Sequence, residues 1–225
     1  MVPPPRIRIH GKKEVTLTNG QFDIKDKIRE KCVIRDWVVL YTGYNKRDYE
    51  LAEQLALNLK KVGKKLGIKV KKPEFVKFKF NPRGGKEKIV GFIKRYVKSY
   101  SRSHKRNPKM ILCLIDNKHQ SLYSFIKEAT YKDLVLLSQV VLKDTITGGG
   151  DDREDRRGGR GGGRGGRGGG GSRVGKMNLS IVSKIIQQMA AKCGKQLWIV
   201  QRPKGLPKHT MLVGVRQLAL SSLLT

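Results

Sequence analysis

Hydrophobic positions along the chain follow two alternating patterns. Continuous apolar runs, such as DWVVLYT at 36–42 and KMILCLID at 109–116, are typical of strands buried on both faces of a sheet. Apolar residues at every third or fourth position are typical of amphipathic helices. These patterns predict strands at 36–42, 68–80, 109–116, 139–143 and 197–200, helices at 47–66, 87–106 and 178–193, and two short helices between 119 and 139.

The alternation of strands with helices predicts an α/β fold with a right-handed, mostly parallel sheet flanked by helices. Ligands of such sheets bind beyond the carboxyl ends of the strands. The loop at 116–122 follows a buried strand directly, so we expect it at that rim. Residues 1–33 include VPPPRIRI and form an expected extended lead-in, because proline disfavours helix at its own and the preceding position.

A glycine-rich segment at 148–172 interrupts the apolar pattern. It holds 14 of the 26 glycines and almost no apolar residue, so it cannot offset its ordering entropy, and we expect a disordered insert. Its Gly-Arg repeats resemble RGG segments that bind RNA, although a tolerated loop expansion explains them equally well. Seven arginines against four acidic residues leave only +3 at 148–173. The segment therefore contributes little of the net charge of the chain and is read as an accessory to the folded part.

The net charge of the 225-residue chain is +31, from 49 Lys and Arg against 18 Asp and Glu. This imbalance predicts a polyanionic partner. The sequence shows no apolar run of membrane-spanning length and no signal peptide, so we expect a nucleic acid and not a membrane as the partner.

Cys32, Cys113 and Cys193 form neither a metal-binding spacing nor a disulfide framework, which indicates a reducing compartment, cytoplasmic or nuclear.

Two sets of polar side chains stand out from the apolar pattern. Tyr123 and Lys127 lie one helical turn apart, and Gln139 opens the strand that follows. In the helix at 178–193, Lys184, Gln188 and Lys192 recur every four residues and form a polar stripe, as a solvated helix face also would. If the two sets converge, they offer the ammonium, hydroxyl and amide donors that a terminal phosphate requires. Lys184, two turns before Lys192, is expected outside a local pocket.

The chain resembles the MID domain of the Argonaute family, in its PIWI branch. The resemblance begins at DWVVLYTGYNKRDYELAEQLALNLKKVGKKLGIKVKKPEF and continues through MILCLIDNKHQSLYSFIKEATYKDLVLLSQVV. It resumes after the glycine-rich segment with KMNLSIVSKIIQQMAAKCGKQLWIV and TMLVGV. It implies a Rossmann-like domain at 34–200, preceded by a linker at 1–33 and followed by the truncated start of a PIWI domain at 201–225.

The resemblance also implies roles for individual residues in holding the 5′ end of a small, piRNA-like guide RNA. Tyr123 matches the tyrosine that stacks on the first base, and Lys127, Gln139 and Lys192 match the groups that bind its phosphate. Gln188 stands where the PIWI branch has a polar residue at the same site. The loop that inspects the first base corresponds to Asn117, Lys118, His119, Gln120, Ser121 and Leu122.

The family's nuclease begins with a strand that ends in Gly-x-Asp, whereas MLVGV is followed here by Arg216. We therefore expect a binding module of RNA silencing and not an enzyme.

No cofactor is certain from the sequence, and the presence of Mg²⁺ at the 5′-phosphate site is left as an open alternative. Expected partners are the guide RNA, target RNA indirectly and other silencing proteins. The alternative is a nonspecific basic RNA-binding or scaffolding protein. A nucleotide-using enzyme is disfavoured because the sequence has neither a P-loop nor a GxGxxG after a strand.

Overall fold

The computed structural model describes residues 6–11, 13–15, 17, 22–43, 46–78, 85–116, 120–147 and 177–201. The predicted insert at 148–172 and all of 201–225 except Gln201 lie outside these residues. So do three residues of the predicted base-inspecting loop, Asn117, Lys118 and His119, together with the side chain of Gln120. Among the described helices, none is both long and apolar enough to cross a membrane.

Four parallel strands form the central sheet, in the order β6-β4-β7-β8. Their bounds are β4 Trp37–Thr42, β6 Glu74–Phe78, β7 Met110–Ile115 and β8 Leu137–Leu142. The inner strands β4 and β7 are buried at every position, which explains their uninterrupted apolar sequences. The predicted α/β fold with a mostly parallel sheet is therefore confirmed.

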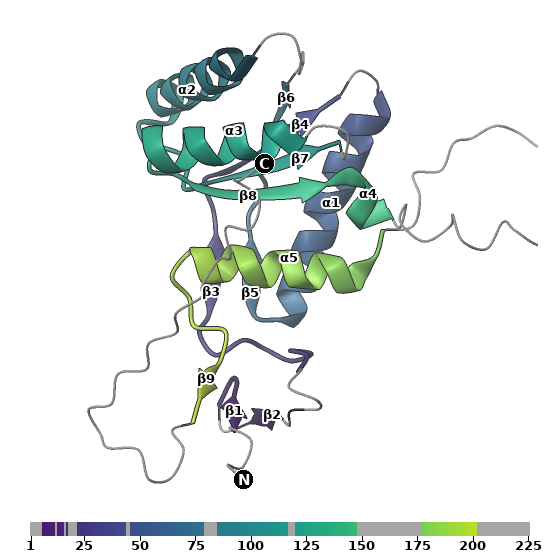
Figure 1. The fold of residues 1–225 in the computed structure, drawn as a ribbon. Helices are drawn as coiled ribbons and strands as arrows, with labels where there is room; N and C mark the ends of the chain where they lie inside the picture. Colours follow the sequence, from purple (N-terminus) through teal and green to yellow (C-terminus); the bar gives the residue numbers. More distant parts are fainter. Residues whose placement is uncertain are drawn as a thin grey trace, which may run out of the picture.

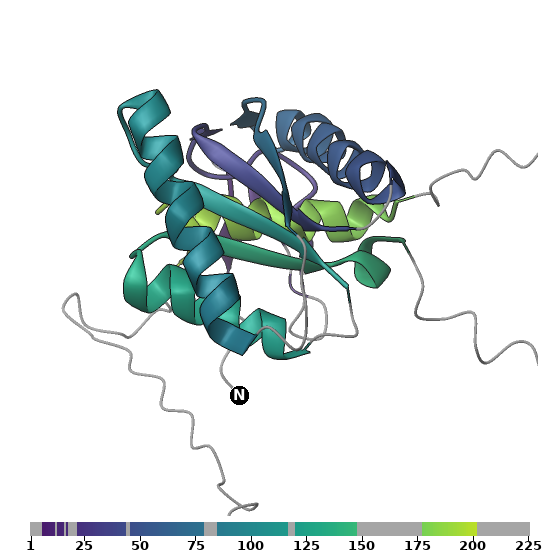
Figure 2. The ribbon, with the colours of Figure 1, turned by 90° about the horizontal axis from the view of Figure 1, so that it is seen from above.

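Helices cover both faces of this sheet (Figures 1 and 2). Side chains alternate along each strand, so Val39 and Leu112 join one hydrophobic cluster while Leu40 and Cys113 join another. The first cluster includes α1 and α5, and the second includes α2 and α3. The bounds are α1 Lys46–Lys65, α2 Gly85–His104, α3 Gln120–Glu128 and α5 Leu179–Lys192.

The segment at 68–80, predicted as one strand, instead forms two. These are β5 (Ile68–Val70), which pairs in parallel with β3 (Cys32–Ile34), and β6, which pairs with β4. Both pairs keep the same sequence offset, since Cys32 lies opposite Ile68 and Val38 opposite Glu74. The long strand pair is thus bent at Asp36, whose φ is 55°, and near Pro73, which has no N–H to donate.

A small antiparallel sheet lies at the lower end of the molecule in Figure 1. Its order is β2-β1-β9, and it joins the lead-in to the end of the described chain. The short strand predicted at 197–200 is therefore present as β9, but it pairs with the lead-in and not with the central sheet. The bounds are β1 Ile7–Arg8, β2 Glu14–Val15 and β9 Ile199–Val200.

Two short elements flank β8. A π-helical segment, η2 (Ala129–Asp133), continues from α3 in place of the second short helix predicted there. At the other end of the strand, α4 (Lys143–Thr147) begins at the residue that was predicted to close the strand. Asn178, just before α5, donates its N–H to Ile146 O at 3.0 Å, so the two ends of the long connection from α4 to α5 lie side by side.

Candidate functional site

Side chains from α3, β8 and α5 meet along the outer edge of the sheet. β8 is the last strand of the sheet, with α3 packed above it and α5 below it in Figure 1. The position of α5 follows from its sequence, because Val182, Ile186 and Met189 are buried against the core. Asn178 caps its first turn by accepting hydrogen bonds from the N–H groups of the residues two and three positions on, at 3.0 and 3.4 Å.

The centre of the site is a pair of ammonium groups that share one backbone carbonyl. Lys127 donates to Ser138 O at 3.0 Å and to Ser138 Oγ at 3.1 Å. Lys192 donates to the same Ser138 O at 2.7 Å and to Gln139 Oε1 at 2.6 Å. Two helices that are far apart in sequence therefore hold their cations against a single point of the edge strand.

The two glutamines extend this network along the strand. Gln139, which is buried, uses its Oε1 to accept from Lys192 and its Nε2 to donate to Gln188 Oε1 at 3.0 Å. This polarity leaves the Nε2 of Gln188 as the donor at the outer end of the chain of hydrogen bonds. The amides and ammoniums thus form one connected set of donors.

Tyr123 places an exposed aromatic ring beside the cations. Its side chain is 49% exposed, and Lys127 Nζ lies 5.9 Å from the ring centre, within the range of a cation–π contact. The ring also lines a cavity of about 610 Å³ whose polar side chains include Gln139, Lys184 and Gln188. The rest of the described lining is mostly apolar, with Lys184 as its one cation, and an exposed aromatic ring beside such a cavity is suited to stacking against a base.

A second cavity, of about 410 Å³, lies on the other side of the ammonium pair. It is lined by Lys127, Ser138 and Lys192, together with Glu128, Tyr131, Lys132, Leu136 and Leu137, and the carboxylate of Glu128 is paired with Lys86 and Lys132. The hydrogen bond from Lys192 to Gln139 joins the residues of the two cavities. A ligand at the ammonium pair can therefore extend in either direction along β8.

The electrostatics of the pair favour an anion. Burial lowers the pKa of Lys192 from 10.5 to about 8, and the nearby charge of Lys127 acts in the same direction. Among the described residues, no carboxylate forms an ion pair with either lysine. Two neighbouring ammoniums that lack a carboxylate partner are stabilised by any anion that can reach both of them.

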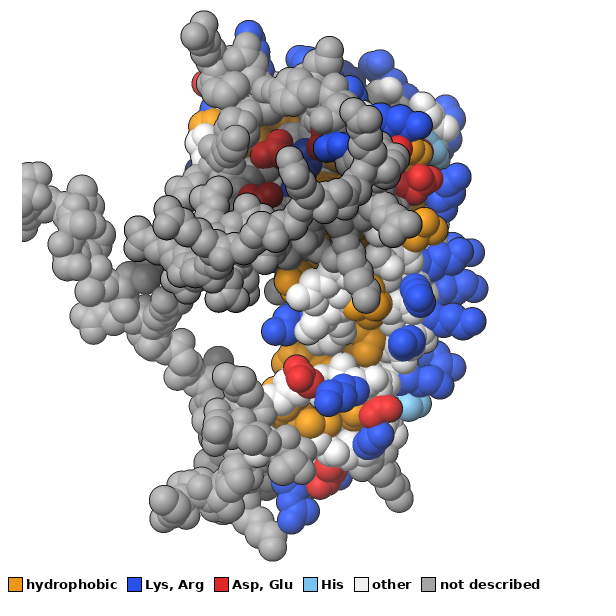
Figure 3. Space-filling model, turned by 90° about the vertical axis from the view of Figure 1, so that its right-hand side faces the viewer, with side chains coloured by type: hydrophobic (Ala, Val, Ile, Leu, Met, Phe, Trp, Pro, Cys, Tyr) orange, Lys and Arg blue, Asp and Glu red, His pale blue; other side chains and the backbone are white. Residues whose placement is uncertain are grey.

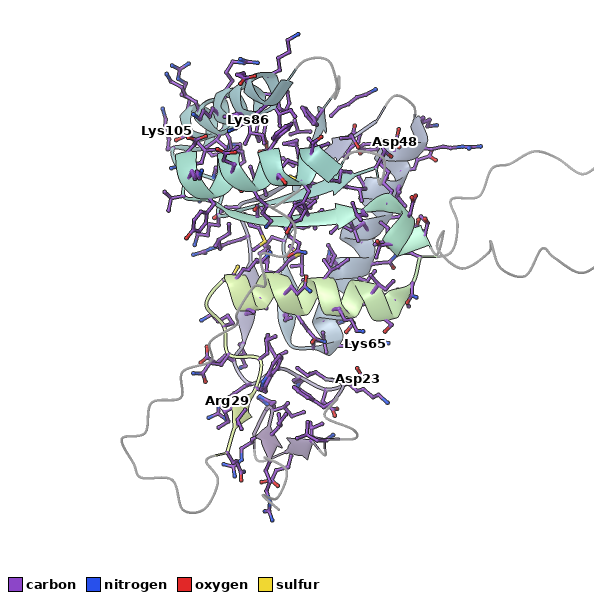
Figure 4. All side chains as sticks on the ribbon, viewed as in Figure 1. Asp23, Arg29, Asp48, Lys65, Lys86 and Lys105 are labelled. Carbon is purple, nitrogen blue, oxygen red and sulfur yellow. The ribbon has the colours of Figure 1, made fainter. Side chains whose placement is uncertain are left out.

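The carboxyl end of the sheet, where we expected the ligand, carries an ion-pair cluster, and Ile115 and Leu142 at the ends of β7 and β8 line the larger cavity. Lys143 is buried and donates to Thr42 O at 2.6 Å, and it pairs with Asp48 at 2.6 Å and Asp116 at 2.9 Å. Figure 4 shows Asp48 near the upper end of α1, facing this region. The cluster ties together the ends of β4, β7 and β8. The predicted side chains gather along the edge of β8, and the larger cavity runs from Gln139 towards Thr145.

The five predicted side chains are brought to one edge, whereas their roles stay predictions. The last three residues of the predicted loop, Gln120, Ser121 and Leu122, instead form the start of α3, where Ser121 is exposed and Leu122 is buried in the core. Two contributors were not predicted. Ser138 supplies the shared carbonyl and hydroxyl, and Lys184, expected outside the pocket, lines the larger cavity. The four-residue stripe of Lys184, Gln188 and Lys192 already contained this signal.

The described side chains do not fit a Mg²⁺ ion at the ammonium pair. Magnesium prefers carboxylates and other oxygen ligands, whereas this site presents two cations to an incoming ligand. No group of three His, Cys, Asp or Glu suited to a metal occurs within the described ranges. The donors are arranged for direct contact with an anion.

No protein-family model matches the chain. It is 23% identical over 180 residues to Piwi-like protein 1 of Gallus gallus, in an alignment that covers 80% of this chain and 16% of that protein. The figures for Protein argonaute-3 of Drosophila melanogaster are the same, 23% over 180 residues, 80% and 16%. The chain thus spans about one sixth of the length of these curated relatives, given the 16% coverage of each.

Solved structures show the same likeness. Drosophila Piwi superimposes with a TM-score of 0.59 at 21% identity, over 90% of this chain and 24% of that one. An A. aeolicus Argonaute gives 0.53 at 15% identity, over 91% and 24%. Aa-Ago with externally bound siRNA gives 0.50 at 17% identity, over 79% and 21%. The resemblance inferred from the sequence is confirmed: the chain is similar to a segment of an Argonaute/PIWI-family protein.

Proposed function

We propose that this Argonaute-like chain holds the 5′-monophosphorylated end of a small guide RNA, of piRNA type, in RNA silencing. The observation that supports it is the pair of ammoniums on Ser138 O, without a carboxylate partner among the described residues. One curated relative is named for Piwi and one for argonaute, and one structural neighbour was solved with externally bound siRNA. The proposed activity is binding, without cleavage by this chain.

In this proposal the phosphate replaces Ser138 O as the shared acceptor of Lys127 and Lys192. Hydrogen bonds between charged groups are about twice as strong as neutral ones, and the partial burial of Lys192 limits competition from water. Gln139 and Gln188 add neutral donors on one side. An RNA ending in a hydroxyl leaves the lysines on these neutral acceptors and lacks the charged hydrogen bonds, which contribute about 1.5–3 kcal/mol each.

The first base of the RNA stacks on Tyr123, since base–aromatic stacking contributes about 1–3 kcal/mol per base. The segment Asn117–Leu122 lies between β7 and Tyr123 in the sequence, and its last three residues form the start of α3, so it is our candidate for sensing which base is present. Buried Leu122 fixes the start of α3 and, with it, the position of Tyr123 one residue later. No metal is required, because the two lysines supply the positive charge.

The test compares one RNA carrying a 5′ phosphate or a 5′ hydroxyl. We expect wild type to prefer the phosphate and Lys127→Ala and Lys192→Ala each to lower that preference by about 10–100-fold, the value of a lost charged hydrogen bond. Lys98→Ala on α2 is the control, because Lys98 is exposed and takes part in no ion pair among the described residues. Lys184 is unsuitable as a control because it lines the larger cavity.

Equal affinity of wild type for the two RNAs would rule the proposal out. The chain would then bind RNA through its general positive charge, as the nonspecific alternative requires.

A further inference from the structure

A second cationic feature lies beside β5, in the two-stranded β3–β5 sheet and not in the four-stranded sheet that ends at β8. A groove of about 510 Å³ runs between the second half of α1 and β5. Five lysines line it, two from α1 and three from β5 and the residues after it: Lys60, Lys64, Lys69, Lys71 and Lys72. Its floor includes Gly67, Ile68 and Val70. We name this feature the α1–β5 groove.

The close packing of α1 on β5 creates the groove. Gly63 lies where the helix meets the strand, and a Cβ there would approach Ile68 O to 2.9 Å and Val70 Cγ2 to 3.1 Å. Because Ile68 and Val70 point into the core, the alternation of the strand directs Lys69 and Lys71 outwards. A larger residue at position 63 would separate the two rows of lysines.

The charge of the groove is not compensated by the chain itself. Between Glu53 and Glu74 the sequence has seven lysines and no acidic residue. None of the five groove lysines forms an ion pair within the described residues. In contrast, Lys86 and Lys94 of α2 pair with Glu128 and Asp133 at 2.7 and 3.3 Å. Figure 3 shows the resulting column of Lys and Arg side chains down the side of the molecule formed by α1.

We propose that the α1–β5 groove binds the sugar–phosphate backbone of a double-stranded nucleic acid. Lys60 and Lys64 repeat at about 6 Å along the helix, and Lys69 and Lys71 at about 6.6 Å along the strand. In a DNA duplex, every second phosphate of one strand recurs at about 6.8 Å along the axis. Single-stranded RNA is bound largely by stacking on aromatic rings, and none of the residues that line the groove is aromatic.

An acidic protein segment is the competing ligand. Protein interfaces depend on buried apolar or aromatic anchors, whereas every groove lysine is exposed and the apolar floor is already packed in the core. The observations therefore favour a phosphate backbone. This inference does not depend on the proposed 5′-end site, which lies beside β8 and shares no lining residue with the groove.

The experiment measures binding of the full chain to a blunt DNA duplex with 5′-hydroxyl ends, so that no terminal phosphate engages the β8 site. The test variant combines Lys64→Gln, Lys69→Gln and Lys71→Gln. The control removes the same charge from α2 with Lys88→Gln, Lys98→Gln and Arg102→Gln, all of them exposed. Figure 4 shows Lys86 of α2 and Lys105, just after α2, at the upper end of the molecule, away from Lys65 at the lower end of α1.

We expect the groove variant to lose about tenfold in duplex affinity and to flatten the slope of log K against log salt by about 2.7, for three contacts of about 0.9 each. The control should change both quantities much less. Equal changes in the two variants would overturn the proposal. It would also be overturned if the groove variant kept its duplex affinity and instead lost binding to polyglutamate, which would assign the groove to an acidic protein.

Circular dichroism of both variants establishes that they are folded, as expected for exposed positions. The preference for a 5′ phosphate on single-stranded RNA, measured with the same proteins, should be unchanged. Its absence in wild type would refute the 5′-end proposal and leave the duplex result standing, so the two failures are distinguishable.

Discussion

The lysines beside β8 and the lysines of the α1–β5 groove carry the same charge in different surroundings. Lys127 and Lys192 are held by shared hydrogen bonds to Ser138, and burial shifts the pKa of Lys192 downwards to about 8. The five groove lysines are exposed and more numerous. A few sheltered cations can recognise one chemical group at one position, whereas many exposed cations attract any polyanion. The net charge of +31 therefore does not identify the specific site.

Salt should separate these two kinds of binding most strongly. We expect affinity for a single-stranded RNA with a 5′ hydroxyl to fall by about 50-fold between 50 and 200 mM salt if about four phosphates are contacted. The ratio of affinities for the phosphate and hydroxyl forms should change by less than about fivefold, because it reflects only the terminal group. Filter binding across a salt series measures both. An affinity that ignored salt would contradict the assignment of a polyanionic partner.

The next largest difference between the β8 site and the α1–β5 groove should be in how far the effects of two lysine substitutions add. Lys127 and Lys192 share Ser138 O and would share one phosphate, so the double alanine variant should lose about 1 kcal/mol less than the sum of the single losses. Lys64 and Lys71 are exposed and screened, and their losses of duplex affinity should add to within about 0.5 kcal/mol. Two double-mutant cycles provide the comparison. Strict additivity at the β8 site would separate the two lysines functionally.

Proton uptake on RNA binding should occur at the β8 site, through Lys192, and not in the α1–β5 groove. With a pKa of about 8, Lys192 is mostly deprotonated in the free protein at pH 8.5, whereas a phosphate dianion favours its charged form. RNA binding should then take up about 0.7 proton, and affinity for the 5′ phosphate should fall as pH rises through 8. The RNA phosphate, with its second pKa near 6, is already dianionic. Calorimetry in two buffers of different ionisation enthalpy measures the uptake, which Lys192→Met should abolish.

Deletion of residues 148–172 should have the smallest effect on the difference between the β8 site and the α1–β5 groove. Because Asn178 N donates to Ile146 O, the connection begins and ends at one place, and shortening it reduces the entropy cost of loop closure. We expect the unfolding free energy to rise by about 1–2 kcal/mol and the preference for a 5′ phosphate to change by less than about twofold. Thermal unfolding and the RNA titration test this, and an unfolded deletion variant would refute the insert interpretation.

The sequence pattern predicted the central elements well because their environment is uniform along their length. β4 and β7 are covered on both faces and are therefore apolar throughout. The bounds of α1 differ from the predicted 47–66 by a single residue at each end. The stretch 68–80 was predicted wrongly as one strand, because alternation reports a local period and contains no information on which strand lies alongside. The bend at Asp36 and Pro73 arises from that pairing.

The sequence predicted which side chains of the candidate site lie together within one helix. It did not predict which helices and strands lie next to each other. Helical spacing placed Tyr123 with Lys127 and Gln188 with Lys192, which needs only the period of a helix. Their convergence depends on β8 lying between α3 and α5, a tertiary arrangement that the family resemblance supplied and periodicity did not. The shared carbonyl of Ser138 could not be found from sequence, because every residue has a backbone carbonyl.

The π-helical turn η2 contributes to the number of residues that separate α3 from β8. A π-turn closes its hydrogen bonds over five residues in place of four, so it accommodates one more residue than an α-helical turn. After this turn and the three residues that follow it, Ser138 hydrogen-bonds with Lys127 of α3 and Thr130 of η2, while Gln139 hydrogen-bonds with Gln188 of α5. Successive strand residues point to opposite faces, so the loss of one residue here would exchange the two positions. The chain's tolerance of length changes should therefore be close to zero at 129–133.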